Sequence, residues 1–250
     1  MLPDRKSIRQ MKNSSLVIDD QTFDDIPYYV KNTHKPDDEK AGMPIAARKD
    51  IGYTYNKKYH KKSINIFAGE YLVSDEDIII GTVLGSCISV CLFSGNSSYC
   101  GMNHFMLPER GVKYKDENDI MRTDSAFYGI HSMEMLINTL MKVGVKKSML
   151  KAKVFGGGNV LKMRSGEKTV GEQNIDFAVK FLEMENIPVV SCSVGGDYAR
   201  KIYFFTKNQE VLQWHLGQNV EKLIVSEERK HRYEKSINKE ISFFENTFGS

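Results

Sequence analysis

The sequence GTVLGSCISV (residues 81–90) contains two strand-like runs joined by a Gly-Ser bend, and Cys87 follows directly after that bend. β-Branched and other apolar residues flank the bend on both sides, which is typical of buried strands. A cysteine at this place has two interpretations. It is a small core residue, because free cysteine is among the most buried residue types, or it is a nucleophile, because a thiol at the edge of a tight bend can meet a substrate.

The segments on either side of the bend predict an α+β fold with mixed or antiparallel sheets and helices on the outside. Strict alternation of strands and helices, the signature of a parallel sheet, is absent. The expected strands cover residues 64–74, 77–85, 87–95, 99–108, 151–159, 189–196, 201–206 and 210–216. The expected helices run from Thr123 or Asp124 to about Gly144, with apolar positions that extend to Met141, and over residues 172–186.

The chain divides into three parts. Residues 1–63 hold four of the six prolines and end in the basic run KKYHKK (57–62), so we expect a flexible N-terminal extension. Residues 64–217 form the expected single folded domain. Residues 218–250 are charged, with apolar residues at rough helical spacing, and predict an amphipathic helical tail. Whether this tail packs on its own domain or on a partner stays open.

Composition narrows the class of protein. The chain has 250 residues, 41% hydrophobic and 27% charged, enough for one sizeable domain or two small ones. A formal net charge of +3 and one short basic run are thin support for nucleic-acid binding, so none is expected. No apolar run approaches the roughly 20 residues of a membrane span. The first residues lack a signal-like apolar segment, so the default expectation is a cytoplasmic protein without membrane insertion.

The cysteines do not predict a metal site. Cys87, Cys91, Cys100 and Cys192 lack CxxC spacing, and no histidine pair lies near them at zinc-finger spacing. We therefore expect free thiols and neither a metal nor a cofactor. Three of the thiols are expected to be core residues, and one is a candidate for chemistry.

Cys87 and His104 form a candidate catalytic pair. They lie on neighbouring expected strands, and such strands commonly pair. A thiol needs a base to become a nucleophile, and an imidazole needs a polar group to hold it, for which Thr82 is available. From spacing alone, however, two unrelated packing residues remain the more common outcome. The run Gly156-Gly157-Gly158 lacks both phosphate-binding patterns, so we expect a tight turn or a bend that lines a site.

Six stretches, taken together, resemble the CheD family of chemoreceptor glutamine deamidases. They are IFAGEYLVS (66–74), TVLGSCISVCLF (82–93), GMNHFMLPERG (101–111), AKVFGGGNVL (152–161), VGEQNIDFAVKFL (170–182) and VVSCSVGGDYARKIYF (189–204). The resemblance spans residues 64–217 and leaves both ends of the chain outside. It implies a sandwich of mixed β-sheets flanked by outer helices.

The resemblance also implies a reaction and its residues. Cys87 corresponds to the nucleophile of the family, His104 to its histidine and Thr82 to its threonine. The implied reaction is deamidation of receptor glutamines to glutamate, and family members also hydrolyse glutamyl methyl esters. The substrate is the helical bundle of a chemoreceptor, and a CheC-type phosphatase is an implied partner.

Some expectations at this site rest on physical reasoning beside the resemblance. Backbone N–H groups near Ser86 are candidates for oxyanion binding, and Gly85, Gly156 and Gly157 are candidates for oxyanion or substrate binding. Two rival interpretations differ in class. A papain-like peptidase or transglutaminase would need sequence contexts that this chain lacks, whereas a non-catalytic adaptor would bind receptor or phosphatase without turnover.

Overall fold

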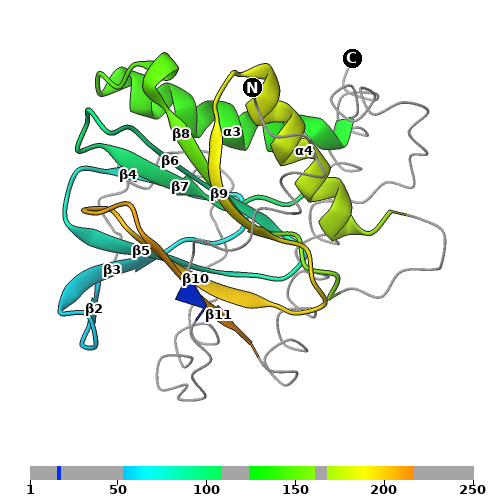
Figure 1. Ribbon diagram of the computed structural model, residues 1–250, viewed down its shortest axis with the longest axis horizontal. Helices are drawn as coiled ribbons and strands as arrows, with labels where there is room; N and C mark the ends of the chain where they lie inside the picture. The colour runs from blue at the N-terminus through cyan, green and yellow to red at the C-terminus, as the bar shows by residue number, and fades with distance from the viewer. Residues whose placement is uncertain (1–15, 18–52, 108–123, 161–167, 217–250) are drawn as a thin grey trace, which may run out of the picture.

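The computed structural model describes residues 16–17, 53–107, 124–160 and 168–216. Two β-sheets lie face to face, and two long helices cover the outer face of one of them (Figure 1). The expected C-terminal helical tail, residues 218–250, lies outside the described residues.

The six-stranded sheet has the order β1-β11-β10-β5-β3-β2 and the five-stranded sheet has the order β4-β7-β6-β8-β9. Pairing is parallel for β1–β11, β3–β5 and β8–β9 and antiparallel elsewhere, so both sheets are mixed. The strands of the first sheet are β1 (Leu16–Val17), β11 (Val211–His215), β10 (Arg200–Phe205), β5 (Ile78–Leu84), β3 (Lys61–Asn65) and β2 (Thr54–Asn56). Those of the second are β4 (Tyr71–Ser74), β7 (Cys100–Asn103), β6 (Ile88–Phe93), β8 (Lys151–Gly156) and β9 (Val189–Val194). The expected α+β sandwich of mixed sheets is confirmed.

The helices are α3 (Asp124–Lys142), α4 (Val170–Met184) and the short 3-10 helix η4 (Lys147–Met149). A capping box starts α4: the Thr169 hydroxyl accepts from the Glu172 N–H, and the Glu172 carboxylate accepts from the Thr169 N–H. The apolar face of α3 ends at Leu140, because Met141 is 46% exposed. Met141, one of the apolar positions at helical spacing, therefore lies outside the buried face.

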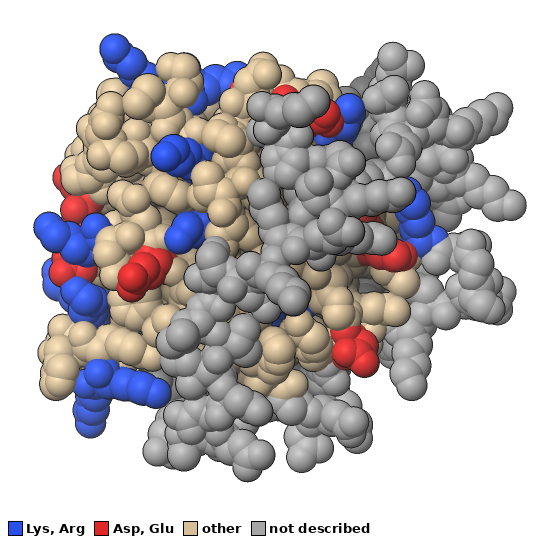
Figure 2. All heavy atoms as spheres, in the orientation of Figure 1, with Lys and Arg blue, Asp and Glu red and all other residues tan. Residues whose placement is uncertain are grey.

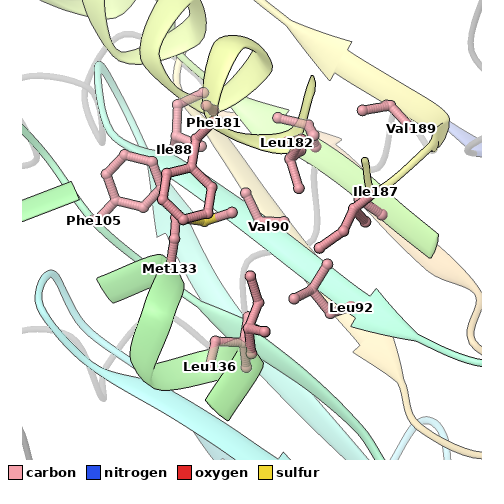
Figure 3. Packing of buried hydrophobic residues seen from close by; sticks show 14 of the residues in the cluster. Ile88, Val90, Leu92, Phe105, Met133, Leu136, Phe181, Leu182, Ile187 and Val189 are labelled. Carbon is pink, nitrogen blue, oxygen red and sulfur yellow. The ribbon is translucent and has the colours of Figure 1, made fainter. Parts of the chain in front are cut away.

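Side chains of β6 alternate between two apolar layers, because successive residues of a strand point to opposite faces. Ile88, Val90 and Leu92 face the helices (Figure 3), whereas Cys87 and Cys91 belong to the core between the two sheets. The helix-facing layer includes Met133, Leu136, Phe181, Leu182 and Ile187. This alternation directs Cys87 into the space between the sheets.

The folded sheet begins before the expected boundary at residue 64. β2 and most of β3 lie within the stretch assigned to the N-terminal extension, and β3 pairs with β5 from Lys62 to Asn65. The basic run at 57–62 does not have the apolar pattern that predicts a strand. It can still form β3, because β3 lies near the edge of its sheet and its lysines are accessible to water. Lys61 pairs with Asp77 and Lys62 with Glu76.

Basic and acidic side chains lie among one another on the described part of one face, drawn in Figure 2. Such interspersed charge gives no extended basic surface on this part of the molecule. None of the helices in the described residues is long and apolar enough to cross a membrane.

Candidate active site

The Gly85-Ser86-Cys87 bend carries the chain from one sheet to the other. β5 ends at Leu84 in the six-stranded sheet, and β6 begins at Ile88 in the five-stranded sheet. Three donors hold the three carbonyls of the bend, each at 2.7 Å: Gly158 N–H to Gly85, Asn174 Nδ2 to Ser86 and Gly157 N–H to Cys87. The backbone on both sides of the thiol is therefore fixed.

The glycine turn after β8 supports this bend. Gly156 has a φ of +111°, and a Cβ atom built there would lie 2.1 Å from the Cys87 carbonyl oxygen, so only glycine fits. The Gly157 N–H is already donated to that carbonyl. In this structure the two glycines thus support the bend, and their expected part in oxyanion or substrate binding stays a prediction.

Strand register brings Cys87 and His104 together. Ile88 and Phe105 form an antiparallel bridge with two backbone hydrogen bonds of 2.9 Å. In this register Cys87 lies opposite Met106, and His104 is its diagonal neighbour on the same face of the sheet. Diagonal neighbours lie roughly 7–8 Å apart, within reach of long and aromatic side chains. The register therefore supports the expected pairing of these two strands.

A hydrogen bond across the two sheets joins Thr82 on β5 to His104 after β7. The Thr82 Oγ1 atom lies 2.8 Å from His104 Nδ1 and donates its one proton to the Ile66 carbonyl at 2.7 Å. Toward His104 the hydroxyl can therefore only accept, so Nδ1 carries a hydrogen, and in the neutral imidazole Nε2 carries the lone pair. An imidazole in this state can accept a thiol proton at Nε2.

The candidate residues are buried. Cys87 is 1% exposed, and Thr82 and His104 are each 4% exposed. Ser86, also buried, places its Oγ atom 3.9 Å from the Met106 sulfur, so its side chain points into the core. An electrostatic interaction in such a space is stronger than in water.

The other three cysteines lie in apolar surroundings. Burial raises the pKa of Cys100 to about 12 and raises the thiol pKa of Cys91 and Cys192 above their usual range. A thiol with a raised pKa forms little thiolate and is a poor nucleophile. Their properties fit the expected packing role.

Sequence reasoning missed two buried polar residues near the site. Asn174, on α4, is 0% exposed and contacts the bend directly. Arg200, also 0% exposed, donates to the Ser193 carbonyl at 2.6 Å and to the Gly195 carbonyl, and burial lowers its pKa to about 10. For Asn174 the available signal was a polar residue on the apolar face of an amphipathic helix. Arg200 stands directly before the expected strand at 201–206, and nothing in its sequence context indicated that it would be buried.

The described residues contain no group of three His, Cys, Asp or Glu side chains that could hold a metal ion. The expectation that the protein needs no metal or cofactor stays a prediction.

Fold and site together define a class: a two-sheet α+β sandwich with a thiol, an imidazole and a hydroxyl where the chain passes between the sheets. Residues 106–214 match the family model described as CheD chemotactic sensory transduction. A probable chemoreceptor glutamine deamidase CheD from Agrobacterium fabrum is 41% identical over 185 residues, which are 73% of this chain and 97% of the relative. One of the same name from Methylobacillus flagellatus is 40% identical over 198 residues, 78% and 95% of the two chains.

A further relative, CheD 1 of Shewanella oneidensis, is 42% identical over 151 residues, 60% of this chain and 71% of the relative. Among solved structures, YfiH of Bacillus licheniformis is 12% identical, with a TM-score of 0.32 over 57% of this chain and 61% of that one, which is a distant likeness. The curated relatives show that this chain belongs to the CheD family.

Proposed function

We propose that this protein deamidates glutamine side chains of a chemoreceptor to glutamate, with Cys87 as the nucleophile. The observation that carries the proposal is the Thr82–His104 hydrogen bond, which leaves the imidazole Nε2 lone pair on the ring edge away from Thr82. The printed names of the relatives, probable chemoreceptor glutamine deamidases, indicate the substrate.

In the first half of the reaction, His104 Nε2 takes the Cys87 thiol proton and the thiolate attacks the carboxamide carbon of the glutamine. The carbonyl π electrons move to oxygen, which becomes an oxyanion. As the oxyanion collapses, the carbon–nitrogen bond breaks, and the imidazolium returns its proton to the departing nitrogen. Ammonia leaves, and the glutamyl group remains as a thioester on Cys87.

In the second half, a water molecule gives a proton to His104 and its oxygen attacks the thioester carbon. The carbon–sulfur bond then breaks, and the imidazolium returns its proton to the sulfur, which restores the Cys87 thiol. The released carboxylic acid loses its proton to solvent and becomes glutamate. Each half passes through an oxyanion, which needs preorganised donors. We assign the backbone N–H of Cys87, on the bend fixed by Gly157, Gly158 and Asn174, as one donor.

The substrate is a helical surface of the receptor, so the protein must accept one side chain from that surface. Cys87 is 1% exposed, and turnover therefore requires a local opening that admits the glutamine. Binding of a CheC-type phosphatase belongs to the same proposal and rests on the resemblance of the sequence alone.

The test is peptide mass spectrometry of a cognate receptor cytoplasmic fragment after incubation in water labelled with heavy oxygen. We expect the wild-type protein to convert specific glutamines to glutamates that carry one labelled oxygen each, and Cys87→Ala to convert none. The matched control is Cys192→Ala, a buried cysteine on β9, which should keep full activity.

Two results would contradict the proposal. If both wild type and Cys87→Ala bind the receptor and neither changes it, the protein is an adaptor. If only methylated glutamates are hydrolysed, it is an esterase that uses the same residues.

A further inference from the structure

We propose that Asn174 is a positioning residue that holds the bend before β6 and the segment after β7 apart beside Cys87 and so fixes the direction of the Cys87 N–H. The inference deepens the proposed function and rests on it. It starts from the hydrogen-bond register of the two strands around their bridge at Ile88 and Phe105.

In an antiparallel ladder, hydrogen-bonded pairs recur at every second residue. After the pair of Ile88 and Phe105, the next such pair is Ser86 and Leu107. A regular ladder would join the Leu107 N–H to the Ser86 carbonyl directly, at about 2.9 Å. Instead, the Leu107 N–H donates to Asn174 Oδ1 at 2.8 Å, and Asn174 Nδ2 donates to the Ser86 carbonyl at 2.7 Å. The carboxamide is inserted into the ladder and separates the two chains by its own width.

A second asparagine interrupts the same ladder on the other side of the bridge. Val90 lies opposite Asn103 in this register, and its N–H donates to the Asn103 side-chain Oδ1 at 2.9 Å. The Asn103 carbonyl accepts from the Ser89 hydroxyl at 2.6 Å. The Ile88–Phe105 bridge is thus flanked by two positions where side-chain amides replace backbone partners, and Cys87 and His104 lie next to these positions.

The hydrogen bond from Asn174 to the Ser86 carbonyl affects Cys87, because Ser86 and Cys87 share one planar peptide group. In a trans peptide the carbonyl of Ser86 and the N–H of Cys87 lie in one plane and point in opposite directions. By holding the Ser86 carbonyl, Asn174 therefore also fixes the direction of the Cys87 N–H, the proposed oxyanion donor. Asn174 is 0% exposed, and the capping box of Thr169 and Glu172 fixes the helix end from which it projects.

The experiment compares wild type, Asn174→Ala, Asn174→Asp and the control Gln173→Ala. Gln173 is the neighbouring helical residue, whose side chain donates to the Lys168 carbonyl at the helix start and not to the bend. Asn174→Asp keeps the size and the acceptor for Leu107 but loses the donor to Ser86. If Asn174→Ala does not fold, Asn174→Asp still tests the loss of the donor to Ser86. Two quantities are measured: kcat and KM for receptor deamidation, and the alkylation rate of each cysteine by iodoacetamide.

We expect both Asn174 variants to lose about 10²-fold in kcat, the scale of removing one oxyanion donor, with KM unchanged. Alkylation forms no oxyanion, so the rate at Cys87 should stay close to that of wild type, and the other three cysteines should stay protected. Gln173→Ala should match wild type in all measurements.

Three outcomes would overturn the role of Asn174: an unchanged kcat, a rise in KM alone, or a fall in kcat accompanied by rapid alkylation of all four cysteines, which assigns Asn174 to fold stability. A wild-type protein that leaves every receptor glutamine unchanged overturns the proposed function and this role with it. That result is distinct, because it appears before any Asn174 variant is compared.

Discussion

At Thr82 one hydroxyl group makes two hydrogen bonds, and the first determines the direction of the second. Its proton goes to the Ile66 carbonyl, so its oxygen accepts from His104 Nδ1. The sequence placed Thr82 near Cys87 along the chain, but it gave no information about Ile66. The state of the imidazole therefore follows from a backbone carbonyl that no sequence motif marks.

Replacement of this hydroxyl tests its role. Thr82→Val keeps the shape but removes both hydrogen bonds, so we expect kcat to fall about 10²-fold, within the range for general acid–base groups. The free energy of unfolding should fall by about 1–3 kcal/mol, because buried polar groups lose their partner. Thr82→Ser retains the hydroxyl and both of its hydrogen bonds, so its kcat should stay close to that of wild type. Steady-state kinetics and urea unfolding measure these effects. Equal kcat for Thr82→Val and wild type would exclude the orienting role.

At the scale of elements, β6 and β7 carry the buried thiols of Cys91 and Cys100, and Cys87 precedes β6 whereas His104 follows β7. Apolar alternation was visible in the sequence, so the existence of these strands was predictable. The interruption of their ladder by Asn103 and Asn174 was not, because an asparagine in a strand or a helix is usually a solvated or capping residue. Only the spatial register shows that each carboxamide replaces a backbone partner.

Cys100 on β7 gives a pH prediction. Its pKa is raised to about 12 by burial, whereas in the unfolded chain the thiol loses its proton near 9. Between these values the unfolded state binds fewer protons, so the stabilising contribution is fully present below pH 9 and is lost as the pH rises. We expect stability to fall by up to about 1.4 kcal/mol per pH unit from this thiol.

The measurement is urea unfolding at several pH values from 8 to 11 for wild type and Cys100→Ala. The variant should show a shallower decline with pH, whatever its stability at pH 8. Parallel declines for the two proteins would mean that Cys100 does not titrate between the two states.

At the scale of the whole molecule, the six-stranded sheet gathers segments from distant parts of the chain. β1 pairs with β11, and β2 and β3 extend the other end of the sheet beside β5. The N-terminal part up to residue 63 was expected to be an extension because its composition is polar and rich in proline. An edge strand also tolerates polar and charged residues, so composition alone could not separate β2 and β3 from a tail.

Truncation distinguishes a folded domain that begins at residue 53 from one that begins at residue 64. A chain that begins at Tyr53 keeps β2 and β3 and should remain folded and active, although it lacks β1. A chain that begins at Ile64 loses β2 and the paired residues Lys62 and Ser63, which exposes the edge of β5. We expect it to be several kcal/mol less stable or insoluble. Circular dichroism measures the stability of both chains, and receptor deamidation measures their activity. Equal stability would mean that the folded domain begins at residue 64.

The sequence by itself determined the order and type of the main elements, the candidate residues Cys87, His104 and Thr82, and the family. Local periodicity, turn residues and short motifs carry that information. Only the tertiary structure decided the imidazole state, the support of the bend and the inserted carboxamide of Asn174. These depend on contacts such as that between Ser86 and Asn174, 88 residues apart in the chain. Such partners are set by strand register and layer packing, which no local pattern encodes.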